Sequence, residues 1–341
     1  MNGLHTVEAA WRQCRAGRPS GEILRTCLKY RESYSKFISL TTLPAEVALP
    51  VGIPTTLFED GAFPIPPDLL NNNVARSAMI NTFHVWAAYR EAKTIYEVEE
   101  SLTECLSRTP WPDRTPIEAL RLQSICPVLM LPENGKITAI AVTYDLIGGG
   151  PNEGPPSLGL RLSRLDPPLW LPFEFFHLVG PDLEACFRAG RNLMVDVDRL
   201  DNREQDSAHR EVVAKLALTV LLYLAGNPDV VRVIHAGQKP AIKESLRSRE
   251  PERYKDLRDP VVHAVGKSFT RAIERWEIEH ASQDTGLTGR TVRSHMRRAH
   301  AHLYWTGEGR KSPRVRFLLP VSVKGGKLVE EPDSPRVMAV R

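Results

Sequence analysis

The chain has 341 residues with a net charge of +4, and its 42% hydrophobic and 25% charged residues match an ordinary globular protein. This composition excludes a collagen, a coiled coil and a wholly disordered chain, and the length allows one large domain or two ordinary ones. The longest apolar run, Leu216–Ala225, is too short to span a membrane, and no secretory leader is predicted, so we expect a cytoplasmic protein.

The first 70 residues are predicted to form a helical and irregular N-terminal region, ahead of a main domain over residues 71–341. Apolar side chains recur every three or four positions within residues 7–39, which predicts two helices separated at Gly17-Arg18-Pro19. Six prolines between residues 43 and 67 then predict a long irregular connection, because proline lacks a backbone N–H and does not continue a helix.

The main domain is predicted to open with a long helix over about residues 74–107. Apolar residues from Met79 to Cys105 recur at helical spacing, which predicts one buried stripe along that helix. We expect it to end before Thr109-Pro110, because the residue before a proline avoids the helical conformation.

A β-hairpin is predicted next. Two β-rich runs, Ile125–Leu131 and Ile137–Leu146, flank Asn134-Gly135, the dipeptide that best tolerates the positive φ angles of a type I′ turn. The alternating run Leu158–Ser163 predicts a third strand, so we expect a small antiparallel sheet over residues 125–163.

Core helices are predicted over residues 207–276. Residues 207–225 are almost entirely apolar after Lys215, which predicts a helix buried on all sides. Residues 241–258 are rich in charge and predict a solvated helix or loop. Asp259-Pro260 then resembles a helix start, and the apolar residues from Val262 to Trp276 predict a stripe on that helix.

The C-terminal segment carries most of the positive charge and is predicted to form a hairpin within residues 290–325. Residues 290–341 hold 12 Lys+Arg and 4 Asp+Glu, which favours a polyanionic partner. On a strand, His300, His302 and Tyr304 share one face, and a returning strand can bring two arginines across from them. The candidate binding residues are His295, Arg297, Arg298, His300, His302, Tyr304, Trp305, Arg314 and Arg316.

Four interpretations of this cluster remain open from the residues alone. The histidines can bind a metal, or perform acid–base cleavage of RNA with arginine stabilising the transition state. Arginines with stacking aromatic rings can instead bind RNA or an acidic surface without chemistry. The hairpin can also be purely structural. We assign no metal, cofactor or catalytic residue, and the five scattered cysteines predict reduced thiols.

The C-terminal motif resembles a known family. The motif reads His295-x-Arg297-Arg298-x-His300-x-His302-x-Tyr304-Trp305-x-Gly307-x-Gly309, followed by Arg314-Val315-Arg316 and Pro320-Val321-x-Val323. It is similar to the C-terminal motif of the second described class of type V-A anti-CRISPR proteins, which mobile elements of bacteria encode. The resemblance covers about residues 75–325.

The predicted elements together indicate an α+β fold, with a helical N-terminal region, a small antiparallel sheet, core helices and a C-terminal β-hairpin. The resemblance implies a regulatory binding protein. Such proteins lower production of the type V effector nuclease by recognising its nascent N-terminal peptide and triggering mRNA loss. The implied partners are that peptide, the ribosome or mRNA, and a host nuclease, with no membrane. Two alternatives remain: a ribonuclease using His295, His300 or His302, and a plasmid-maintenance nucleic-acid-binding protein.

Overall fold

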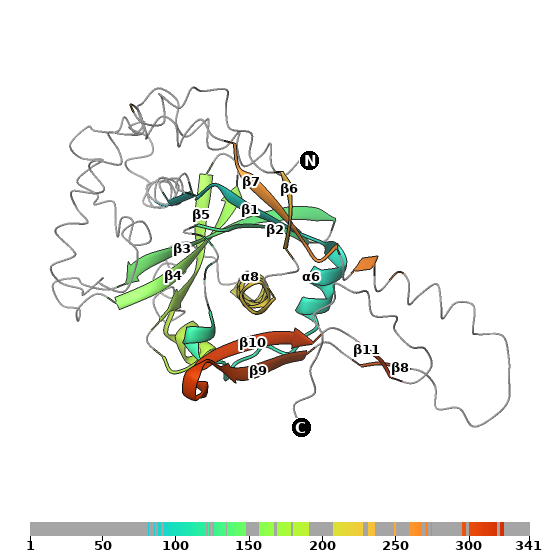
Figure 1. Cartoon of the computed structure of the whole chain (residues 1–341). Helices are drawn as coiled ribbons and strands as arrows, with labels where there is room; N and C mark the ends of the chain where they lie inside the picture. The colour runs from blue at the N-terminus through green and yellow to red at the C-terminus, as the bar shows by residue number, and fades with distance from the viewer. Residues whose placement is uncertain are drawn as a thin grey trace.

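The structure is a computed structural model of the whole chain (Figure 1). The residues it describes are 81, 85, 88, 89, 92–120, 122, 124, 126–133, 135–147, 157–166, 169–178, 180–190, 207–227, 231–235, 249, 259–267, 270, 271, 274, 295–297, 300–318 and 321–323. The predicted N-terminal region and its boundary at residue 70 lie outside this part of the chain, as does nearly all of the charged segment 241–258. None of the described helices is long and apolar enough to cross a membrane.

A seven-stranded mixed sheet forms one wall of the protein, with the strand order β5-β4-β3-β2-β1-β7-β6. Strand β1 runs parallel to both of its neighbours, and the other adjacent pairs are antiparallel. Parallel strands need a crossover connection, and helix α6 (Glu100–Ser107) with the short helix η2 (Ile117–Ala119) provides it between β1 and β2. The strands are β1 Thr94–Val98, β2 Val128–Glu133, β3 Lys136–Ile147, β4 Ser157–Asp166, β5 Leu169–His177, β6 Val231–His235 and β7 Val261–Val265.

The predicted central hairpin is confirmed. Strands β2 and β3 pair antiparallel up to Glu133 and Lys136, which leaves two residues in the turn. Gly135 has a φ of +74°, as the Asn-Gly dipeptide predicts. The predicted third strand is also correct, because β4 pairs with β3. The expected small antiparallel sheet is therefore real, but it is part of a larger mixed sheet.

The predicted continuous helix over residues 74–107 is wrong in its middle. The described residues between 81 and 92 that precede β1 are helical, and Lys93 N–H still donates to Tyr89 O at 2.6 Å. Lys93 then adopts a φ of +46°, which ends the helix. The following residues, Thr94–Val98, form β1, because threonine, isoleucine, tyrosine and valine suit a buried strand.

The predicted helix start at Asp259-Pro260 is also wrong. Val261–Val265 form strand β7, which pairs with β1 on one side and with β6 on the other. Valines three residues apart suggest a helical stripe, but valine is β-branched and favours strands. Gly266, with a φ of +96°, separates β7 from helical residues that include Lys267 and Thr270.

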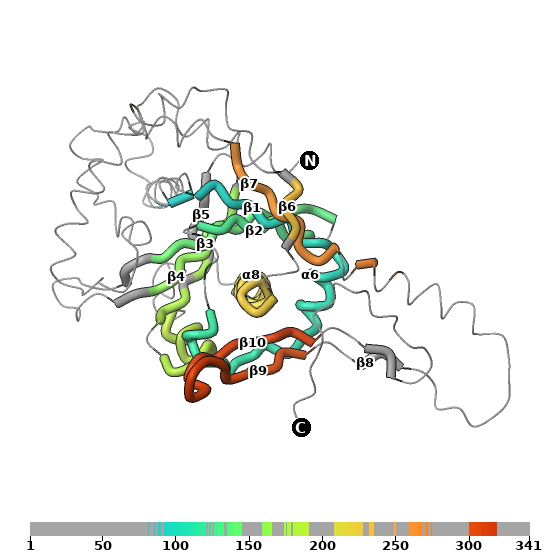
Figure 2. Tube along the Cα trace, in the orientation of Figure 1, coloured from blue at the N-terminus to red at the C-terminus, as the bar shows by residue number. Residues whose placement is uncertain are grey.

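Helix α8 (Ser207–Gly226) occupies the centre of the structure, as its sequence predicts. Figure 1 looks along this helix, which lies between the large sheet, helix α6 and a second hairpin. That hairpin consists of β9 (His300–Thr306) and β10 (Ser312–Leu318), with the short helix η5 (Glu308–Arg310) between them. Figure 2 shows the same enclosure along the backbone trace. The apolar residues of α8 from Val213 to Leu224 are buried, apart from the partly exposed Leu216.

The opposite face of the sheet also carries a buried polar contact. Leu160 and Leu162 of β4 belong to the core around α8, so the alternating Arg161 and Ser163 point to the other face. There the side chains of Asn81 and Ser163 share hydrogen bonds of 3.1 and 3.2 Å, and Arg161 donates to Asn81 Oδ1 at 3.1 Å. Asn81 therefore lies on the opposite side of the sheet from α8.

A half-buried histidine of the sheet contacts a tyrosine of the neighbouring strand. His263 of β7 pairs with Tyr96 of β1, and their rings stack with centroids 5.0 Å apart and an interplanar angle of 19°. Burial lowers the pKa of His263 and raises the pKa of Tyr96 to about 12. Both side chains are therefore neutral in the folded protein near neutral pH.

The first prediction concerns the contact between α8 and the hairpin. A Cβ atom at Gly226 would lie 1.8 Å from the backbone oxygen of Val315 in β10, so Gly226→Ala must push the hairpin away from the helix. We expect a loss of about 1–3 kcal/mol in the free energy of unfolding, measured by urea denaturation. Gly135→Ala is a comparison of a different kind, because its Cβ would meet nothing within 4 Å and its loss of about 1–2 kcal/mol reports positive φ alone. A free energy of unfolding for Gly226→Ala equal to that of the wild type would contradict the close approach.

The second prediction concerns acid stability. The unfolded chain protonates His263 near its ordinary pKa of about 6.5, whereas the folded chain resists that proton, so the unfolded state binds more protons as the pH falls. The free energy of unfolding should therefore decrease as the pH drops from neutral through this value. His263→Phe keeps a ring beside Tyr96 and should flatten the pH profile, although burial also lowers the pKa of His177 and leaves a residual slope. An unchanged slope would contradict the assignment to His263.

Candidate functional site

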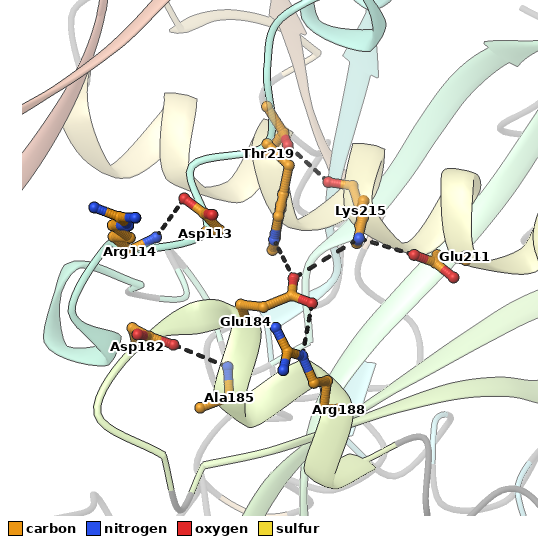
Figure 3. A network of polar contacts seen from close by, with 10 residues as sticks. Asp113, Arg114, Asp182, Glu184, Ala185, Arg188, Glu211, Lys215 and Thr219 are labelled. Carbon is orange, nitrogen blue, oxygen red and sulfur yellow. Dashed lines mark hydrogen bonds and ion pairs between the residues drawn. The ribbon is translucent and has the colours of Figure 1, made fainter.

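Two polar clusters in the described part of the chain are candidate sites. The first surrounds Glu184, in a helical segment over residues 183–190 (Figure 3). The carboxylate of Glu184 accepts a hydrogen bond from Trp111 Nε1 at 3.2 Å and pairs with Arg188 Nε at 3.0 Å. Lys215 of α8 lies 3.8 Å from the same carboxylate and 2.8 Å from Glu211. The cluster therefore ties three distant segments together.

This cluster is structural. The carboxylate of Glu184 already has three cationic or N–H partners, and the ammonium of Lys215 lies 5.1 Å from the ring centroid of Phe187 and 5.8 Å from that of Trp111. Such contacts satisfy charges at the edge of a core. Sequence reasoning missed the cluster, because only its pairs four residues apart are visible along the chain.

The second cluster is the β9–β10 hairpin, which the sequence predicts. In the observed register Tyr304 pairs with Arg314 and His302 pairs with Arg316. The two arginines therefore lie across from ring-bearing residues on the same face, as expected from the alternation of both strands. His300, on the same face of β9, pairs with Leu318 and is half-buried.

The other face of the hairpin packs against the core. Val315 and Phe317 of β10 are buried, and Ala301 and Leu303 of β9 pack beside them. The ring of Phe317 lies 6.0 Å from that of Tyr223 in α8. Since one face is fixed against α8, the opposite face is presented to solvent on a rigid support.

Aromatic rings are exposed at the free end of the hairpin. The rings of His302 and Tyr304 lie 4.4 Å apart between centroids, tilted by 36°. Tyr304 is 39% exposed and Trp305 is 50% exposed. Tyrosine and tryptophan are enriched at binding interfaces, because each combines a large apolar ring with one polar atom, so this end of the hairpin is the stronger candidate for binding.

Positive charge surrounds these rings. Three cationic residues of the hairpin are exposed and one is half-buried: Arg310, Lys311 and Arg314 are exposed, and Arg316 is half-buried. Within residues 300–318 the sequence has a single acidic residue, Glu308. In the part of the chain that the structure describes, none of these four cations forms an ion pair. The turn is held by Gly307 and Gly309 at positive φ and by a 3.1 Å hydrogen bond from Thr306 Oγ1 to the backbone oxygen of Ser312. The face is therefore an uncompensated cationic surface.

The remaining predicted site residues lie outside the β9–β10 hairpin. His295 and Arg297 lie in the short strand β8 (His295–Arg297), which pairs with β11 (Val321–Val323) in a separate two-stranded sheet. Arg298 lies outside the described residues. The structure therefore brings His302, Tyr304, Arg314 and Arg316 together on one face and places Trp305 beside them on the strand.

The arrangement favours binding over metal or thiol chemistry. Among the described residues, no group of three or more His, Cys, Asp or Glu side chains is placed to hold a metal ion. Cys105, Cys126 and Cys186 are free thiols, as expected, and burial raises the pKa of Cys105 to about 11, so it is not a thiolate at neutral pH. Arginines beside exposed rings can instead bind phosphates and flat bases.

Three comparisons with known proteins bear on this chain. The model of the AcrVA2-like family, described as the anti-CRISPR type V subtype A2 family, matches residues 96–325. The fold is similar to the crystal structure of AcrVA2, with a TM-score of 0.52 and 16% sequence identity over 93% of this chain and 97% of that chain. The search of curated proteins gave no match.

A third prediction tests the structural role of Glu184. Glu184→Ala removes the acceptor shared by Trp111, Arg188 and Lys215, and we expect it to lower the free energy of unfolding by about 1–2 kcal/mol in urea denaturation. Glu104→Ala is the matched control, because Glu104 also pairs with an arginine four residues later, Arg108, but on an exposed surface. That control should change stability by less than about 0.5 kcal/mol. A larger loss for Glu104→Ala would refute the assignment.

Proposed function

Because the chain belongs to the anti-CRISPR type V subtype A2 family, we propose that it lowers production of a type V effector nuclease by recognising the effector's nascent N-terminal peptide. Recognition during translation then triggers loss of the effector mRNA. The observation that carries this proposal is the family match over residues 96–325, which includes the complete β9–β10 hairpin. The partners of this function are the nascent peptide, the ribosome or mRNA, and a host nuclease.

The exposed hairpin face supports a role beside RNA. A protein acting on a nascent chain works where ribosomal RNA and mRNA are concentrated, and cationic side chains gain affinity there by releasing counterions from phosphates. Arg314 and Arg316 provide such side chains, and their ladder partners Tyr304 and His302 provide flat rings. The hairpin would therefore hold the protein at the translating message while another surface reads the peptide.

A ribonuclease is the alternative that the same face allows. His302 lies across from Arg316, and a histidine beside an arginine can transfer protons while the guanidinium stabilises charge on phosphorus. Intrinsic cleavage requires activity in the purified protein, whereas recruitment of a host nuclease does not. The two mechanisms therefore separate in a cell-free assay.

The fourth prediction is a fall in effector mRNA that depends on translation. Cells carrying a type V effector gene with and without this protein are compared by quantitative measurement of the message. We expect the message to fall only when it is translated, so destroying the start codon should protect it. A frameshift confined to the first codons should also protect it, because the peptide changes while the RNA stays almost the same.

Each other result points to a different function. Equal loss of the translated and untranslated messages would contradict nascent-peptide recognition and favour direct action on RNA. Cleavage of effector RNA by the purified protein, abolished by His302→Ala, would establish the ribonuclease instead. An effector mRNA level that is the same with and without the protein, for every version of the message, would refute the proposal.

A further inference from the structure

We infer that the outer face of the β9–β10 hairpin binds single-stranded RNA, with unpaired bases on its rings and phosphates on its guanidinium groups. This inference rests on the proposed function, because it assigns the RNA contact of that function to a ligand class and to named residues. Three features of the described residues carry it: the paired rings, the position of the arginines, and the rigid support beneath them.

The rings provide surfaces for unpaired bases. Tyr304 and His302 lie two residues apart on one face of β9, with ring centroids 4.4 Å apart, and Tyr304 is exposed. Aromatic faces bind bases whose own faces are free. In duplex RNA the bases stack on one another and the major groove is too deep and narrow for side chains to reach them. The rings therefore favour a single strand.

The arginines lie close enough to the rings to contact the phosphates of a bound single-stranded RNA. Arg314 pairs with Tyr304 and Arg316 pairs with His302, and directly opposite side chains of an antiparallel ladder have Cβ atoms ~4.5–5.5 Å apart. Each ring-bearing residue therefore has an arginine directly across from it on the same face. A nucleotide presents the same combination, one flat base and one phosphate. Neither arginine forms an ion pair with any residue that the structure describes, so both charges are available.

The free end of the hairpin extends this surface. Trp305 lies on the opposite face of β9 from Tyr304 but is 50% exposed, because it follows the residues that α8 and the core cover. Arg310 and Lys311 are exposed in the adjacent turn. At this end of the hairpin, Trp305 could therefore contact one more base of the bound RNA, and these two cations could contact one more phosphate.

The support beneath the face is rigid. Phe317 packs on Tyr223, and Gly226 at the end of α8 lies so close to Val315 that a Cβ atom there would overlap the backbone oxygen. A surface that is already ordered loses little conformational entropy on binding. An acidic protein segment would also be attracted to the charge, but it would not need the ring faces, so removal of the rings distinguishes the two ligands.

The test measures binding of the purified full chain to labelled oligonucleotides by fluorescence anisotropy. The probes are an oligouridylate of roughly 12 nucleotides, DNA of the same length, and an RNA duplex of the same length. We expect the single-stranded RNA to bind more tightly than the duplex. Tyr304→Ala should weaken binding about 5- to 150-fold, the effect of losing one stacked base, whereas Tyr304→Phe keeps the ring and should bind nearly as wild type.

Charge is tested separately. Arg314→Ala should weaken binding and reduce the slope of log affinity against log salt by about 0.7, the value for one lost phosphate contact with a single strand. Arg232→Ala is the matched control, because Arg232 is also an exposed strand arginine but lies in β6, at one edge of the large sheet. It should leave affinity and slope unchanged. Unfolding curves of all variants confirm that the hairpin remains folded.

The inference fails if the duplex binds as tightly as the single strand, if Tyr304→Ala binds as wild type while Arg314→Ala does not, or if RNA does not bind at all. Binding of single-stranded DNA much more tightly than of single-stranded RNA would overturn the RNA assignment. These failures leave the proposed function standing if the effector message still falls in a translation-dependent way. Conversely, tight ring-dependent RNA binding with no loss of the message would support this inference and refute the proposed function.

Discussion

The burial of helix α8 on all sides is the constraint on which the rest of the structure depends. A helix that is apolar around its circumference must be covered by other elements, and one face of a sheet cannot cover it alone. The large sheet, helix α6 and the β9–β10 hairpin each cover part of it (Figure 1). The hairpin is therefore as necessary for the core as the sheet, although it begins about 70 residues beyond the end of the helix in sequence.

The same constraint produces the candidate site. Strand side chains alternate, so a hairpin that packs one face on a helix must present its other face to solvent. Here the buried face carries Val315 and Phe317, and the free face carries Tyr304, Arg314 and Arg316. Core packing and the candidate binding surface thus use alternate residues of the same two strands. This arrangement explains how a short surface element can hold several cations and rings in a fixed order.

Local chemistry made the two hairpins and helix α8 predictable. The Asn134-Gly135 turn, the alternation of His302 and Tyr304, and the apolar run after Lys215 each require only neighbouring residues. Strands β1 and β7 were not predictable in this way. Both are short interior strands of the sheet, and their sequences show no alternation of polar and apolar residues. Their apolar residues lie at helical spacing, which by itself favours a helix.

The sequence by itself therefore determined the resemblance to an anti-CRISPR family, the buried helix and the polar face of the C-terminal hairpin. Tertiary structure alone decided the mixed sheet, since β1 forms hydrogen bonds with strands that follow it by about 30 and 170 residues. It also decided that Glu184, Trp111 and Lys215 meet, and that His295 and Arg297 join another pair of strands. Such contacts depend on how the chain returns on itself, and no pattern of adjacent residues records that path.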